Sequence, residues 1–134
     1  MAQEVTVKTK EQLYRGKPLA ELQQMDVREV AKLLPSRSRR SVLRHFDVIE
    51  KFIARANTKT EKKKKIKTHN RDLVIVPHLV GLTISVHMGK AFEDIQITHE
   101  MIGHRLGEFA LTRKQVKHGS AGIGATKSSR AEKK

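Results

Sequence analysis

The sequence predicts an α+β fold with N-terminal helices, a small three-stranded sheet with a packed helix, and an extended basic C-terminal tail. Apolar residues recur at helical spacing as far as Ala56, and short apolar runs at strand spacing follow between Leu73 and Ile97. After Leu111 no periodicity remains among the glycines, serines and basic residues. With 134 residues, the chain can form one domain with an extension or two.

Two short helices are expected before Pro35. Residues 1–17 are polar and we expect them to be loose, whereas Pro18 suits the first position of a helix. A second helix should begin at Asp26, an N-cap with Glu29 as its capping-box partner, and should end at Pro35. The apolar faces comprise Leu19, Leu22 and Met25 in the first helix and Val27, Val30, Ala31 and Leu34 in the second.

A third helix of about four turns should begin near Ser36 or Ser38. Its apolar face comprises Val42, Phe46, Ile49, Ile53 and Ala56, and its basic residues (Arg39, Arg40, Arg44, Lys51 and Arg55) lie mostly elsewhere on the surface.

Residues 57–67 have almost no apolar content and include four adjacent lysines, Lys62 to Lys65. Because four neighbouring ammonium groups repel one another, we expect a flexible arm in the free protein.

The sheet should consist of three strands. The run Leu73-Val74-Ile75-Val76 before Pro77 predicts a buried strand, and alternating Leu82, Ile84 and Val86 predict the second. Gly89 is expected to supply a positive φ in the turn that follows. Ile95 and Ile97 predict the third strand, in which the out-of-phase Phe92 indicates either a bulge or a strand with two apolar sides.

A last helix is expected after Thr98, a suitable N-cap, with Ile102, Leu106 and Phe109 on one face. Gly103 and Gly107 are costly inside a helix, at about 1 kcal/mol each relative to alanine. Two glycines four positions apart therefore indicate close approach by a sheet, another backbone or a nucleic acid.

The charge of the chain indicates an anionic partner. Lysine and arginine total 28 against 14 acidic residues, so the formal net charge is +14 and the pI is about 10.4. Seven basic and one acidic residue lie in 57–71, and eight basic and two acidic residues lie in 105–134. Such a charge points first to nucleic acid and second to an anionic membrane surface. We accordingly divide the chain into a helical extension (1–35), an RNA-binding α+β domain (36–112) with a basic arm at 57–71, and a basic flexible tail (113–134).

Composition excludes several other classes. Cysteine is absent, which rules out disulfides, cysteine zinc sites and thiol catalysis. Aromatic residues make up 4% of the chain and tryptophan is absent, which argues against base stacking as the main mode of binding. No apolar run reaches the length of a membrane span, and the N-terminus lacks the pattern of a signal peptide. We therefore expect a soluble cytoplasmic protein.

Two motifs suggest enzyme chemistry but fail on spacing. His99 and His104 are five positions apart, whereas the zinc-protease motif needs histidines four apart on one helix face. Residues 119–128 resemble a phosphate loop, but Ala125 and Thr126 separate the glycines from Lys127. No nucleophile and base stand at a suggestive spacing. We expect neither a catalytic site nor a metal or other cofactor.

Several phrases of the sequence resemble a known family. They are Lys67-Thr68-His69-Asn70-Arg71-Asp72, Val86-His87-Met88-Gly89-Lys90, Met101-Ile102-Gly103-His104-Arg105-Leu106-Gly107-Glu108-Phe109 and Gly122-Ile123-Gly124-Ala125-Thr126-Lys127-Ser128-Ser129. They closely resemble the S-nineteen family of small-subunit ribosomal proteins, in its archaeal–eukaryotic branch. The segment from Tyr14 to Arg37 also looks like the N-terminal extension of that branch. The resemblance is strong over roughly half of the chain.

The resemblance implies a structural, non-catalytic component of the small ribosomal subunit. Members of the family bind the head of this subunit, on the 3′ major domain of its RNA, beside the S-thirteen protein and near the large subunit. Their C-terminal tail is expected to extend toward the tRNA and decoding region. Local charge and resemblance together assign RNA contact to Arg37, Arg39, Arg40, Lys62, Lys63, Lys64, Lys65, Lys67, His69, Arg71, Gly103, His104, Gly107, Arg113, Lys114, Lys117, His118 and Lys127.

Two other readings remain open. A general nucleic-acid compaction protein would bind duplex DNA and arbitrary RNA alike, whereas a ribosomal protein should prefer one particular RNA. A membrane-surface or acidic-partner protein is disfavoured because no basic amphipathic helix with bulky apolar residues is evident.

Overall fold

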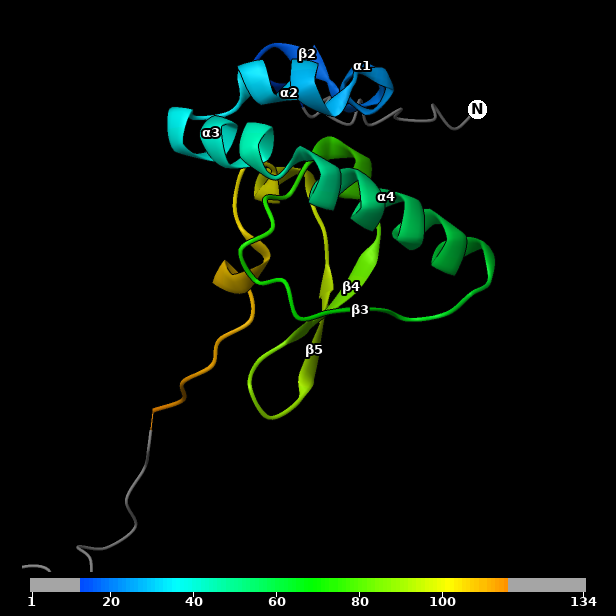
Figure 1. Ribbon diagram of the computed structural model, residues 1–134, viewed down its shortest axis with the longest axis vertical. Helices are drawn as coiled ribbons and strands as arrows, with labels where there is room; N and C mark the ends of the chain where they lie inside the picture. Colours follow the sequence, from blue (N-terminus) through cyan, green and yellow to red (C-terminus); the bar gives the residue numbers. More distant parts are fainter. Residues whose placement is uncertain (1–12, 116–134) are drawn as a thin grey trace, which may run out of the picture.

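The computed structural model describes residues 13–115 (Figure 1). Its helices are α1 (Leu19–Gln24), α2 (Val27–Leu33), α3 (Ser36–Arg44) and α4 (Phe46–Glu61). Its strands are β1 (Leu13–Tyr14), β2 (Lys17–Pro18), β3 (Ile66–Thr68), β4 (Thr83–His87) and β5 (Phe92–Gln96). Three short 3-10 turns complete it: Pro77–Leu79, His99–Met101 and Leu106–Glu108. The α+β class with helices before a three-stranded sheet is confirmed.

The two N-terminal helices lie where the apolar spacing predicts them. Leu22 of α1 and the second helix's predicted face, Val27, Val30, Ala31 and Leu34, are all buried. Two details were wrong. The Asp26 side chain forms no cap hydrogen bond, and residues 13–18 form a small antiparallel β1–β2 hairpin instead of a loose segment. Positive φ angles at Arg15 (51°) and Gly16 (80°) make this tight turn.

The predicted third helix is divided in two at His45, whose φ of −111° and ψ of 28° separate α3 from α4. The predicted face nevertheless holds, since Val42, Ile49 and Ala56 are buried, as is Phe52. The expected flexible arm at 57–67 is wrong in part: residues 57–61 continue α4 and residues 66–68 form β3. Lys62–Lys65 make the turn between them, with Lys63 at a φ of 50°.

The sheet is mixed, with strand order β3-β4-β5. β3 runs parallel to β4 and pairs Ile66 with Ile84, whereas β5 runs antiparallel and pairs Ile95 with Ile84. Gly89, at a φ of 98°, lies in the β4–β5 turn as predicted. β5 pairs with β4 without a bulge, so Phe92 makes the strand two-sided.

Residues 73–76 do not form the predicted first strand, because their partner is not a strand of the sheet. The Ile75 N–H donates to the His104 carbonyl at 2.8 Å and the Gly103 N–H donates to the Ile75 carbonyl at 3.0 Å. These bonds pair an irregular buried segment with residues 103–106. The apolar run therefore correctly predicts that residues 73–76 are buried, but the prediction that they form a strand is wrong.

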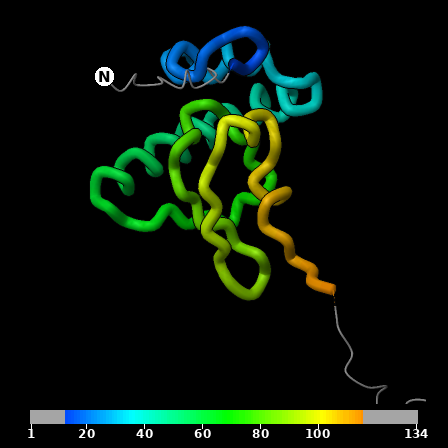
Figure 2. Tube along the Cα trace, turned by 180° about the vertical axis from the view of Figure 1, so that it is seen from behind, coloured from blue at the N-terminus to red at the C-terminus, as the bar shows by residue number. Residues whose placement is uncertain are grey.

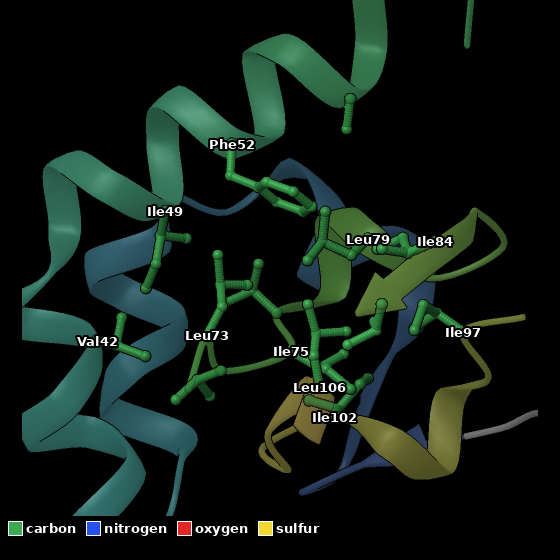
Figure 3. Close-up of a cluster of buried hydrophobic side chains, with 14 of the residues drawn as sticks. Val42, Ile49, Phe52, Leu73, Ile75, Leu79, Ile84, Ile97, Ile102 and Leu106 are labelled. Carbon is green, nitrogen blue, oxygen red and sulfur yellow. The ribbon is translucent and has the colours of Figure 1, made fainter. Parts of the chain in front are cut away.

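The helix expected after Thr98 is replaced by two of the 3-10 turns. Gly103 lies between them with a φ of 87°, which a continuous helix does not allow. The helix that packs against the sheet is instead α4, which crosses it in Figure 1. Figure 3 shows the resulting core, in which Ile49 and Phe52 of α4 face Leu73, Ile75 and Leu79.

His78, in the first 3-10 turn, is expected to make the fold less stable in acid. Burial lowers the pKa of its imidazole below the usual 6.5, although the Asp26 carboxylate and the Met25 backbone act in the opposite direction. The unfolded chain therefore binds a proton more readily, and the free energy of unfolding decreases as pH falls below about 6.5. We expect His78→Gln to make stability less dependent on pH between 7 and 5 in urea titrations. Equal pH dependence in the two proteins would contradict this role.

Candidate nucleic-acid interface

The exposed face of α3 presents three arginines. Arg37, Arg40 and Arg44 are three and four positions apart, which places them on one side of the helix. All three are exposed, and within residues 13–115 none has a carboxylate partner. Guanidinium groups in such a row can grip successive phosphates in a bidentate manner. We call Arg37, Arg40 and Arg44 the α3 arginine face. Arg44 is not among the predicted RNA contacts and belongs to this face because of its position on the helix.

Arg39 faces a different neighbour. Its guanidinium donates to the carbonyls of Ala31 at 3.2 Å, Lys32 at 2.8 Å and Leu34 at 3.3 Å. These carbonyls lie at the C-terminal end of α2, where a cation is favourable, and that of Ala31 also accepts a hydrogen bond from the Leu34 N–H. Arg39 therefore ties α3 to α2, and its contact with RNA stays a prediction.

The Lys62–Lys65 turn places four exposed ammonium groups at the end of α4. Lys65 donates to Asp94 at 3.0 Å, across the outer side of the sheet. The Ser85 hydroxyl also donates to this carboxylate, and it and Lys65 hold the pKa of Asp94 below its usual range. Asp94 thus offsets part of the charge of Lys65, whereas Lys62, Lys63 and Lys64 have no carboxylate partner within residues 13–115.

A cleft lies between α4 and the β3 edge of the sheet. Its basic residues are Arg55 and Lys59 from α4 and Lys67 from β3, with His69 beside them, and no carboxylate lines it. We call it the α4–β3 cleft. Arg55 and Lys59 are not among the contacts predicted from sequence. Their spacing of four positions puts them on one face of α4, but only the tertiary fold places β3 opposite that face.

Three of the predicted contact residues are engaged inside the fold. Arg71 donates to the carbonyls of His87 at 2.7 Å, Gly107 at 2.9 Å and Ala110. A Cβ on Gly107 would lie 3.0 Å from both Cβ and the carbonyl oxygen of Arg71, so the predicted close approach is by another backbone. Gly103 lies against Tyr14, whose hydroxyl would be 3.3 Å from an added Cβ. These residues shape the fold, and their contact with RNA stays a prediction.

The remaining predicted contacts lie at or beyond the C-terminal edge of the structure. His104 is exposed and its Nδ1 lies 2.7 Å from a Glu108 carboxylate oxygen. Arg113 and Lys114 are exposed and have no regular structure. Lys117, His118 and Lys127 lie outside the described residues. Figures 1 and 2 show the turn after α4 and residues 112–115 on different sides of the core.

The described residues hold no group of three histidine, cysteine or acidic side chains suited to a metal ion. Among these residues no helix has the length and apolarity needed to cross a membrane. What the structure offers is a set of separated cationic surfaces around an apolar core: the α3 arginine face, the Lys62–Lys65 turn and the α4–β3 cleft. Such an arrangement can contact several phosphate strands at once.

Residues 36–118 match the family described as "Ribosomal protein S19". The "Small ribosomal subunit protein uS19" of Halorubrum lacusprofundi is 52% identical over 126 residues, which cover 90% of this chain and 89% of the relative. The protein of the same name from Methanocella arvoryzae is 49% identical over 117 residues, covering 87% of this chain and 82% of the relative. The matched range begins at the first residue of α3 and includes α4 and the sheet.

Proposed function

Since the chain belongs to the ribosomal protein S19 family, we propose that it binds the head of the small ribosomal subunit, on the 3′ major domain of the RNA. Membership confirms the broader expectation of a structural constituent of the small subunit that is not an enzyme. In this role the protein holds converging RNA segments together and thereby supports translation. Its cations screen the repulsion between phosphates, and its core fixes the position of each cationic surface.

The observation that carries this proposal is the α3 arginine face. Arg37, Arg40 and Arg44 project from one side of a helix, and the same side has no acidic residue within α3. Because these arginines are suited to phosphates, we expect recognition to rest mainly on the shape of the RNA backbone. The Lys62–Lys65 turn and the α4–β3 cleft supply further contacts from other sides of the core.

The proposed function also includes contacts with neighbouring molecules of the ribosome. The partners are the S-thirteen protein of the head and, near the tail, large-subunit bridge elements and tRNA. Support for the tail comes from its composition, since residues 113–134 include Arg113, Lys114, Lys117, Lys127 and Arg130 but only one acidic residue. Leu43 and Val48 are about half exposed, at 51% and 42%, and offer an apolar contact for a neighbour on α3 and α4.

The test compares binding of the full chain to a 3′ major domain transcript and to an unrelated structured RNA of equal length, across a salt series. We expect a preference for the 3′ domain that persists as salt rises. If about seven cations contact phosphates, log K should fall with log salt at a slope of about −5 to −6. Equal affinity for both RNAs, lost together as salt rises, would favour the general nucleic-acid compaction protein.

A further inference from the structure

The outer face of the sheet carries a cluster of three rings. His87 ends β4 and Phe92 begins β5, and the two are directly paired across the strands. Their ring centres lie 5.0 Å apart, and the His69 ring lies 4.5 Å from His87 and 5.2 Å from Phe92. We call these residues the ring cluster. Composition argued against aromatic stacking, but the strand register gathers the few available rings at one place.

Within residues 13–115, most outward positions of this face are accessible, although Ser85 is buried beside Asp94. The inward side chains Ile84, Val86 and Ile95 are buried, whereas outward positions such as Lys67 and Gln96 are exposed. His69 is exposed, and His87 and Phe92 are only partly buried. The ring cluster therefore has aromatic surface available for a planar ligand.

The ring cluster and the α4–β3 cleft form one continuous site. Lys67 lines the cleft, and its Nζ lies 5.2 Å from the centre of the Phe92 ring. His69 also lines the cleft while its ring belongs to the cluster. Across the cleft stand Arg55, whose Nε donates to the Lys51 carbonyl at 3.2 Å, and Lys59. A surface for a base thus adjoins a pocket for an anion.

A metal ion does not suit these histidines. The His69 and His87 rings face each other at a tilt of 34°, and the described residues supply no third ligand to make a metal-binding group. A planar ring that carries a phosphate matches both halves of the site. In a duplex the bases are stacked inside, so only an unpaired nucleotide presents both groups.

We propose that this site binds one unpaired nucleotide of RNA, with its base stacked on the ring cluster and its phosphate in the α4–β3 cleft between Lys67, Arg55 and Lys59. The proposal rests on the function proposed above and adds a site that reads a single-stranded position. Stacking tolerates any base because every base has an aromatic face, so the site recognises an unpaired nucleotide and not a particular sequence.

The test separates stacking from charge on the 3′ major domain transcript. Phe92→Leu removes the ring and should weaken binding by about 5- to 150-fold, without changing the salt slope. Phe92→Tyr keeps the ring and should retain affinity. Arg55→Gln with Lys59→Gln should instead make the slope less negative by about 1.4–1.8. The matched control, Lys32→Gln with Lys51→Gln, removes the same charge from exposed positions outside the cleft and should change the slope less.

A second measurement needs no variant. Ultraviolet irradiation of the complex should link bases to the segment that contains His69 or to the one that contains Phe92, and mass spectrometry would locate the links. Circular dichroism establishes that each variant is folded, and His69→Gln, at an exposed position, repeats the stacking test if Phe92→Leu is unstable.

Wild-type affinity in folded Phe92→Leu and His69→Gln would overturn the nucleotide site. If these variants bind normally while the wild type still prefers the 3′ domain, the proposed function stands and this inference alone fails. If the wild type shows no RNA preference, the proposed function itself fails.

Discussion

The Arg71→Met variant should unfold about 10–14 °C below the wild type, corresponding to a loss of about 3 kcal/mol. The guanidinium joins three separate backbone carbonyls, those of His87, Gly107 and Ala110. Methionine keeps the length of the side chain but cannot donate a hydrogen bond, so partly buried acceptors lose their partner. The end of β4 would then separate from the turn at 106–110.

Thermal unfolding followed by circular dichroism measures this effect, with two matched variants beside it. Arg40→Met makes the same exchange at an exposed position of α3 and should change stability by no more than about 0.5 kcal/mol. Arg71→Lys keeps the charge, but a single ammonium group cannot reach all three carbonyls. Its stability should therefore lie between those of Arg71→Met and Arg40→Met. If Arg71→Met were as stable as Arg40→Met, the guanidinium would contribute nothing to the fold.

The largest expected effect on RNA binding comes from replacing Arg37, Arg40 and Arg44 together with glutamine. If each arginine neutralises one phosphate, affinity for the 3′ major domain transcript should fall about 100- to 500-fold near 0.1 M salt. The salt slope should become less negative by about 2–3, and the affinities of variant and wild type should converge near 1 M salt. Glutamine is a good helix former, so α3 should persist.

A control variant with the same change in net charge tests whether the loss of affinity is specific to the α3 arginine face. Lys32, Lys51 and Lys90 are exposed in α2, α4 and the β4–β5 turn, and their replacement by glutamine also removes three positive charges. Filter binding across a salt series compares the two variants. We expect only a small loss in the control, whereas equal losses would show that total charge, and not the α3 arginine face, determines affinity.

The elements that sequence predicted well are those defined by neighbouring residues. The faces of α1 and α2 repeat within one or two turns, and β4, Gly89 and β5 form a local hairpin. The segments at 73–76 and 103–106 were misassigned because they bond to each other. An apolar run indicates burial wherever its partner lies, but only the partner decides whether a strand forms.

In the candidate site, too, sequence predicted what depends on neighbouring residues and missed what depends on tertiary position. Sequence identified exposed cations on α3 and in the Lys62–Lys65 turn, because charge and helix spacing are local properties. It could not separate Arg40, which is free at the surface, from Arg71, whose donors are occupied by carbonyls far along the chain. Nor could it anticipate that β3 would lie opposite Arg55.

The contacts of Gly103 bear on how the chain folds as it is synthesised. Gly103 lies against Tyr14, and its carbonyl accepts a hydrogen bond from the Ser38 hydroxyl at 2.8 Å, across a separation of 65 residues. Tyr14, Leu34 and Ser38 therefore emerge from the translating ribosome well before residue 103, whereas α3 and α4, on which α2 packs, follow it directly. Until Gly103 follows, the side of Leu34 and Pro35 that it contacts is exposed to incorrect contacts.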